Sequence, residues 1–146
     1  MKRSQNISLD FNKVIKNMST SDFLNLQQYR ALFGVLFFFT TVLPTWFQYI
    51  GGLGDIAAGL AAIFTLTMFK NKKIDEQKAI LRGNVVGVLD FIVVLNLGAL
   101  VVLAHESPDV IFNMIPLYVV PIFISIHIFS FIRLKKLKKE NIVQVI

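Results

Sequence analysis

Three ionisable residues, Asp55, Asp90 and His127, lie inside long apolar stretches of this sequence, and Arg30 lies at the edge of one. A charged side chain at the centre of a bilayer costs about 2.5 to 3.5 kcal/mol on insertion scales, so each of these residues needs a partner or a role. A carboxylate close to an imidazole can bind a proton or a ligand. These four are therefore the candidate functional residues, and the helices that carry them decide whether they meet.

The elements that carry them have the composition of membrane helices. The chain is 55% hydrophobic and 16% charged, whereas soluble domains have about 25% charged residues. From Ala31 to Phe69 the only charged residue is Asp55. As a helix this stretch would measure roughly 58 Å, about twice the ~30 Å hydrocarbon core, which predicts a helical hairpin. Continuous apolar runs argue against a β-barrel.

We predict an all-α membrane protein with four transmembrane helices. Ser19 to Asp22 supply N-cap candidates, and Pro44 with the glycines after it marks the first turn. The predicted spans cover residues 21–43 (or on to 49), 52–69, 83–104 and 108–132. The domain organisation is a basic N-terminal segment (1–20), a four-helix transmembrane domain (21–133) and a basic cytoplasmic tail (134–146). Two interpretations stay open for the N-terminal segment: an amphipathic helix on the membrane surface, or a disordered tail.

The basic residues predict the orientation. Five Lys and Arg precede Ala31, five lie in 70–82 and five follow from Arg133, whereas the turns 44–54 and 105–109 contain none. Basic loops stay on the cytoplasmic side, so both termini are predicted to be cytoplasmic. The expected location is the bacterial cytoplasmic (inner) membrane, as a multi-pass protein. The basic residues are expected to face anionic lipid headgroups, and no nucleic-acid partner is expected because no recognition motif accompanies them.

Depth along the helices predicts which polar residues meet. Asp90 lies about 10 Å and His127 about 9 Å from the inner boundary, so the two are expected to be in contact. Arg30 and Asn84 lie nearer that boundary and complete a predicted intramembrane polar cluster of Arg30, Asn84, Asp90 and His127. Two interpretations stay open: a proton-titrating or ligand-binding site, or a structural pair in which Asp90 and His127 satisfy each other.

Asp55 is predicted to be an outer-side polar residue, about 6 Å below the outer surface and roughly 14 Å from Asp90. It ends a Gly-x-Gly-Asp pattern at 52–55, typical of intramembrane aspartyl proteases. Those enzymes need two adjacent carboxylates, so this separation argues against them. No catalytic residues, metal ligands or cofactor site are predicted. The absence of cysteine excludes thiolate chemistry, and His105 lies too far from His127 to share a haem.

Several short elements occur in a characteristic order. They are Gln28-Tyr29-Arg30, Leu43-Pro44, Gly52 to Asp55, Gly87 with Asp90, and Ile115-Pro116 through Pro121 to His127. In this order, over residues 27 to 133, the chain resembles a family of small, uncharacterised bacterial four-helix integral membrane proteins. The resemblance implies fold and location but no activity.

Small residues mark two predicted packing faces, Gly83 with Gly87 and Gly52 with Gly59 and Ala62. They predict a close approach of the second and third helices. The favoured interpretation is a non-enzymatic structural or partner-binding membrane subunit. The alternative is a small oligomeric proton-linked transporter or channel that uses Asp90 and His127. Four helices make a bundle too thin to surround most solutes, so transport would require a homo-oligomer or a larger membrane complex.

Overall fold

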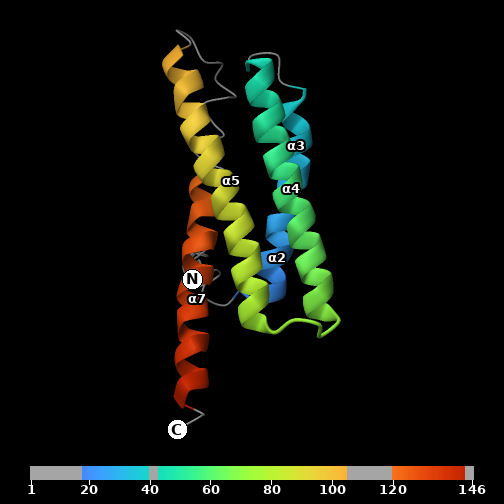
Figure 1. Ribbon diagram of the computed structural model, residues 1–146, viewed down its shortest axis with the longest axis vertical. Helices are drawn as coiled ribbons and strands as arrows, with labels where there is room; N and C mark the ends of the chain where they lie inside the picture. The colour runs from blue at the N-terminus through green and yellow to red at the C-terminus, as the bar shows by residue number, and fades with distance from the viewer. Residues whose placement is uncertain (1–17, 40–42, 105–119, 144–146) are drawn as a thin grey trace, which may run out of the picture.

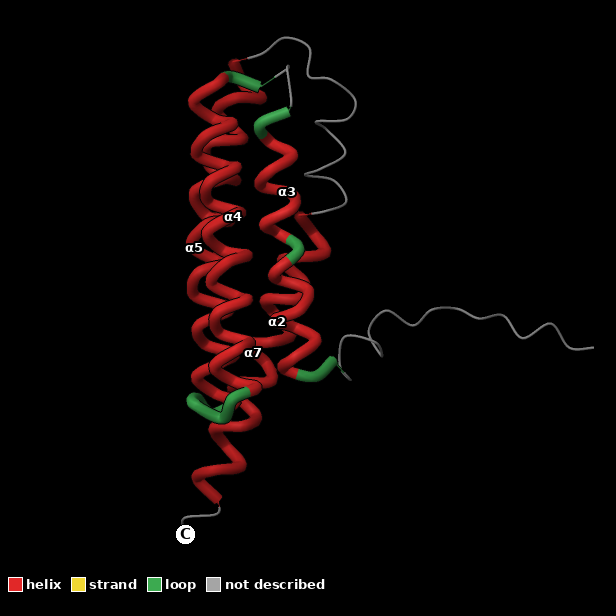
Figure 2. The backbone as a smooth tube through the Cα atoms, turned by 90° about the vertical axis from the view of Figure 1, so that its right-hand side faces the viewer, coloured by secondary structure: helices red, strands yellow, loops and turns green. Residues whose placement is uncertain are grey.

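The computed structural model describes residues 18–39, 43–104 and 120–143, and these residues form α-helices joined by short turns (Figures 1 and 2). The helices are α2 (Thr20–Gln28), α3 (Arg30–Phe37), α4 (Thr45–Lys70), α5 (Glu76–Ala104) and α7 (Val120–Val143). The predicted all-α class is confirmed, and the described ranges contain no strand. The predicted amphipathic segment up to residue 17 and the start of the predicted fourth span, at 108, lie outside the described residues.

The first predicted span is two short helices in succession. Ser19 caps α2 through a reciprocal arrangement: its hydroxyl accepts from the Asp22 N–H at 3.1 Å, and the Asp22 carboxylate accepts from the Ser19 N–H at 3.0 Å. Tyr29 separates α2 from α3, and its N–H bonds to the carbonyl of Leu26 at 3.3 Å. This three-residue spacing tightens one turn. The helical path is therefore distorted at Tyr29, and α3 follows directly after this residue.

Helices α4 and α5 form an antiparallel hairpin, and both are longer than the predicted spans. The glycines at 51, 52 and 54, predicted to lie in a turn, are inside α4, and only Pro44 stands before it. Lys72 takes a positive φ of 55° in the connection. The Asp75 carboxylate accepts from the Lys78 N–H at 2.7 Å, which caps α5 and lowers the pKa of Asp75.

The helices form an elongated bundle. In Figure 1, α4 and α5 lie side by side, with α2 and α3 in succession along α4 and α7 along the lower part of α5. Figure 2 shows α7 continuing past the α4–α5 turn. The helix runs to Val143, beyond residue 133 where the transmembrane domain was predicted to end. In the part of the chain that the structure describes, α4 and α5 are long and apolar enough to cross a membrane.

Glycines bring α3 and α4 together. A Cβ added to Gly34 would lie 2.5 Å from the carbonyl oxygen of Gly52, and one added to Gly59 would lie 2.6 Å from the backbone nitrogen of Ala31. The prediction that Gly52 and Gly59 bring α4 close to α5 is wrong, because both glycines face α3, and the α4 glycine that lies against α5 is Gly54, beside Asp90. Gly83 faces Phe23 and Leu24 of α2 instead.

The outward faces of α4 and α5 are apolar. Leu53, Leu60 and Phe64 on α4, and Leu89, Ile92 and Leu100 on α5, are each more than half exposed. In contrast, the buried residues of the bundle include charged and polar side chains, among them Arg30, Asn84 and His127. The bundle therefore carries its polar groups inside and large apolar groups outside.

Candidate functional site

Arg30, the first residue of α3, is the centre of the site and is only 2% exposed. Its Nε donates to Asp55 Oδ1 at 2.8 Å, and Nη2 lies 2.7 Å from the same oxygen. Nη2 also forms an ion pair with Asp90 Oδ2, and Nη1 donates to the carbonyl of Gly87 at 3.0 Å. One guanidinium therefore joins α3, α4 and α5.

Aromatic rings enclose this guanidinium. Its central carbon lies 4.2 Å from the centroid of the Phe91 ring and 5.7 Å from that of Phe123. These distances are within the range of cation–π attraction. Both carboxylates are largely buried, with 13% of the Asp55 side chain and 10% of the Asp90 side chain exposed. Burial strengthens the Coulombic attraction between these charges.

The predicted separation of roughly 14 Å between Asp55 and Asp90 is wrong. Both carboxylates bind the same guanidinium. The reason is the helix ends: α4 and α5 extend well beyond the predicted spans, and Asp55 and Asp90 lie nearly equal numbers of residues from their shared turn. In an antiparallel hairpin, such positions are level.

His127 forms the second half of the site with side chains from α2 and α5. Its Nδ1 lies 2.8 Å from Asn84 Oδ1, and its Nε2 lies 3.1 Å from Gln27 Nε2. A carboxamide oxygen only accepts, so Nδ1 carries the proton and Nε2 accepts from Gln27. Ser130 donates to the same Asn84 oxygen at 2.7 Å. The imidazole is therefore neutral, with both nitrogens used.

The two halves meet at Gly87. A Cβ on this residue would lie 2.5 Å from His127 Cε1 and 3.1 Å from Arg30 Nη1. The structure thus brings the four predicted residues into one region, and adds Asp55. The predicted pairing of Asp90 with His127 is wrong, since the structure joins Asp90 to Arg30 and His127 to Asn84. Among the described residues, the buried Asn84 Nδ2 has no hydrogen-bond partner.

Sequence reasoning missed Gln27 and Ser130 as members of the site. Gln27 precedes Arg30 by three residues, and Ser130 follows His127 by three. Residues three apart share a helix face, so this spacing is a signal that could have identified both. The Gly87 carbonyl is different, because a helix carbonyl that accepts from a distant side chain leaves no mark in the sequence.

A cavity of about 230 Å³ adjoins the ion pairs. Arg30 and Asp55 line it together with four phenylalanines and four aliphatic residues, namely Phe33, Phe37, Phe91, Phe123, Leu36, Leu43, Val94 and Val120. An apolar pocket with a few convergent polar groups is the usual form of a small-molecule site. Within the described ranges, no group of three or more His, Cys, Asp or Glu residues is placed to hold a metal ion.

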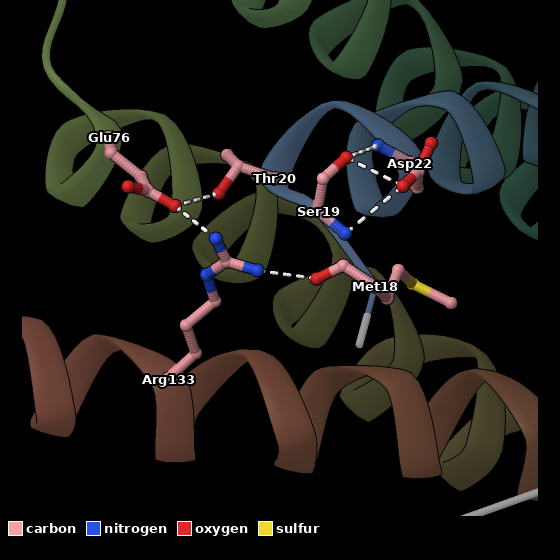
Figure 3. Close-up of polar contacts among 6 residues, drawn as sticks. All are labelled: Met18, Ser19, Thr20, Asp22, Glu76 and Arg133. Carbon is pink, nitrogen blue, oxygen red and sulfur yellow. Dashed lines mark hydrogen bonds and ion pairs between the residues drawn. The ribbon is translucent and has the colours of Figure 1, made fainter. Parts of the chain in front are cut away.

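A second network joins three helices at the basic end of the bundle (Figure 3). Arg133 Nη2 lies 2.6 Å from Glu76 Oε1, which also accepts from the Thr20 hydroxyl at 2.5 Å. Arg133 Nη1 donates to the carbonyl of Met18. These contacts tie α7 and α5 to the start of α2. A larger cavity of about 560 Å³ opens beside them, lined by Thr20, Ser130 and Arg133 among others.

The Arg133–Glu76 pair should contribute little to stability. About a third of each side chain is exposed, and solvent screens such pairs to below about 1 kcal/mol. A double-mutant cycle of Arg133→Gln and Glu76→Gln, read out by denaturant unfolding in detergent, should show a small positive coupling. The exposed Lys78–Asp75 pair is the control and should show no measurable coupling. A coupling energy several times larger than about 1 kcal/mol would contradict the prediction that solvent screens this ion pair.

Comparisons with known proteins give a family but no activity. A family model described as Domain of unknown function (DUF8737) matches residues 5–135. No curated protein and no solved structure matches the chain. The matched range contains all the residues of the buried site.

Proposed function

We propose that this chain, which belongs to the family described as a domain of unknown function (DUF8737), is a small proton-linked membrane transport protein. The observation that carries the proposal is the charge balance of the buried site, where one guanidinium faces two carboxylates. The predicted cluster, with Arg30 and Asp90 as its charged members, was neutral. The structure adds Asp55, and with both carboxylates ionised the site has one negative charge in excess.

The membrane setting rests on the outward faces of α4 and α5. Exposed apolar patches on this scale mark contact with lipid or protein, and both helices have the length and hydropathy to cross a bilayer. We propose the full arrangement of four crossings, with α2 and α3 as the first and residues 108–132 as the fourth. Both termini are then in the cytoplasm of a bacterium, and the basic residues contact anionic headgroups of the inner membrane.

The excess charge requires a cation. Ionised carboxylates away from water are stable only when they are paired. Arg30 neutralises one of the two acids, so the second is neutral when a proton is bound. Two carboxylates that share a site commonly share one proton. Intramembrane acids that bind and release protons are a recurring part of transport proteins, and this site has the required composition.

A chain of buried polar contacts runs from the cavity at the basic end toward the site. Ser130 lines the 560 Å³ cavity there and donates to Asn84, whose oxygen bonds to His127. His127 lies beside Gly87, which also contacts Arg30. The 230 Å³ cavity adjoins Arg30 and Asp55. Ser130, Asn84 and His127 thus form a buried hydrogen-bonded chain that ends beside Gly87, and the apolar-walled cavity lies against Arg30 and Asp55.

A non-enzymatic structural or partner-binding subunit is the second candidate. The observation that favours it is that every nitrogen of Arg30 already has a partner within the chain. A site in which every Arg30 nitrogen already has a hydrogen-bond partner could have a purely structural role. It would then hold α3, α4 and α5 in register. The two functions differ in whether the bound proton exchanges with solvent, which a flux measurement decides.

The test is proton flux into liposomes that contain the purified protein, driven by an imposed pH gradient. Asp55→Asn and Asp90→Asn should each abolish the flux, because either change removes the excess charge that binds the proton. Asp75→Asn is the matched control: it changes an exposed acid outside the site and preserves the helix cap, so its flux should equal that of the unaltered protein.

Flux no higher than in protein-free liposomes would contradict the transport proposal and favour the partner subunit. Flux that survives in both Asn variants would contradict the role of the charge balance. The same preparations report oligomeric state, and since a single bundle is thin, flux is expected from a dimer or larger assembly.

A further inference from the structure

We propose that the 230 Å³ cavity binds a small lipophilic monocation, such as a quaternary or protonated amine, in exchange for the proton of the buried site. This inference rests on the proposed function and specifies its substrate class. It is carried by three observations that meet at one place: the aromatic lining of the cavity, the Asp55 carboxylate in its wall, and the excess negative charge beside it.

The walls of the cavity suit an organic cation. Phe33, Phe37, Phe91 and Phe123 line it, and aromatic faces attract quaternary ammonium groups. Arg30 already uses the Phe91 ring in this way, with 4.2 Å between its central carbon and the ring centroid. The aliphatic residues complete a surface for the apolar part of the ligand. Ligand pockets commonly measure roughly 300 to 1,000 Å³, and this cavity is smaller, so it suits a small ligand.

The charges select the sign of the ligand. An anion would add to a site that already has one negative charge in excess, and the nitrogens of Arg30 already bind Asp55, Asp90 and the Gly87 carbonyl. A neutral apolar molecule would fill the cavity but leave the charge as it was. A monocation supplies the positive charge that the proton otherwise supplies.

The exchange balances in charge. When the cation enters, the proton shared by the acids leaves to solvent, and the Asp55 carboxylate becomes the counter-ion; when the proton returns, the cation leaves. Among the described residues, the titratable groups that face this site are Arg30 on α3, Asp55 on α4, Asp90 on α5 and His127 on α7. The α2 helix contributes Gln27, which does not titrate. One proton should therefore be released for each cation bound.

The probe for this inference is radiolabelled benzyltrimethylammonium, with neopentylbenzene as its neutral isostere, and the sample is the full-length protein in detergent. Equilibrium dialysis measures binding, and an indicator dye in weak buffer measures proton release. We expect saturable binding that weakens as the pH is lowered, with one proton released per cation. Neopentylbenzene should not compete with the cation for the cavity. It should also release no proton when it is added alone.

Variants locate the binding to the cavity. Asp55→Asn should abolish both binding and proton release. Phe33→Leu keeps an apolar wall but removes one ring, and should weaken binding several-fold. Phe64→Leu is the matched control, because Phe64 lies on the outward face of α4 and is 65% exposed; its binding should be unchanged.

Each contrary result has a separate meaning. No binding of the cation, with proton flux in liposomes intact, overturns this inference and leaves the proposed function standing. Binding without proton release, together with no flux, overturns both. Equal binding of neopentylbenzene and the cation, or equal loss in Phe33→Leu and Phe64→Leu, overturns the inference, because either shows that an apolar surface alone is responsible.

Discussion

Arg30→Leu should produce the largest loss of folded protein of any single substitution in this chain. The change removes the guanidinium that pairs with two carboxylates, each about nine-tenths buried. Removing one partner of a buried ion pair costs about 3 to 5 kcal/mol, which is a large part of the stability of most folded proteins. The expected result is a collapse of the monodisperse fraction in detergent size-exclusion chromatography and a lower thermal midpoint.

Two companion variants separate charge from packing in that experiment. Arg30→Leu combined with Asp55→Asn and Asp90→Asn leaves no charge in the site, and should recover much of the lost stability. Arg82→Leu is the control, because Arg82 is an exposed arginine on α5 that forms no ion pair with any described residue and donates to the Met68 sulfur. A similar melting behaviour for Arg30→Leu and Arg82→Leu would show that the buried ion pairs do not hold the bundle together.

Gly34→Ala should separate α3 from α4. The added methyl group would lie 2.5 Å from the Gly52 carbonyl oxygen and 2.8 Å from the backbone nitrogen of Ile56. These are backbone atoms, which cannot rotate away as a side chain can. Overpacking of this kind costs about 1 to 3 kcal/mol. Because α3 carries Arg30, the variant should also weaken the ion pairs, and the expected reading is a lower unfolding midpoint in detergent together with reduced proton flux.

Gly98→Ala is the matched control for that substitution. A Cβ at this position would lie 3.5 Å from Phe47 Cζ, an ordinary van der Waals contact. Alanine also favours the helix over glycine by up to about 1 kcal/mol, so Gly98→Ala should be as stable as the unaltered protein or slightly more so. If Gly34→Ala and Gly98→Ala unfold alike, the close backbone contact between α3 and α4 is not a determinant of stability.

Much of the fold follows from local properties that a sequence displays. Apolar runs of helical length predict helices, and Ser19 and Asp22 predict the cap at the start of α2. Depth along the helices predicts that Arg30, Asn84, Asp90 and His127 gather in one cluster, because each helical residue advances about 1.5 Å along the helix axis. All four lie in one region of the folded chain.

Partner choice within the site did not follow from the sequence. The position of a polar residue along its helix gives its depth, but the rotation and axial shift between two helices decide which polar atoms touch. Here those variables depend on contacts such as Gly34 against Gly52, which fit backbone to backbone. The predicted second and third spans began at residues 52 and 83. These boundaries placed Asp55 roughly 14 Å from Asp90, which is between two and three helical turns.

The amino-acid order therefore specified that each segment is an apolar helix, and which charged residues lie along it. It did so because those properties depend on neighbours within a few residues. The packed bundle specified how the helices meet, and with it that Asp55 and Asp90 share Arg30. That pairing gives the site its excess charge, because a charge balance is a property of groups brought together and not of any one of them.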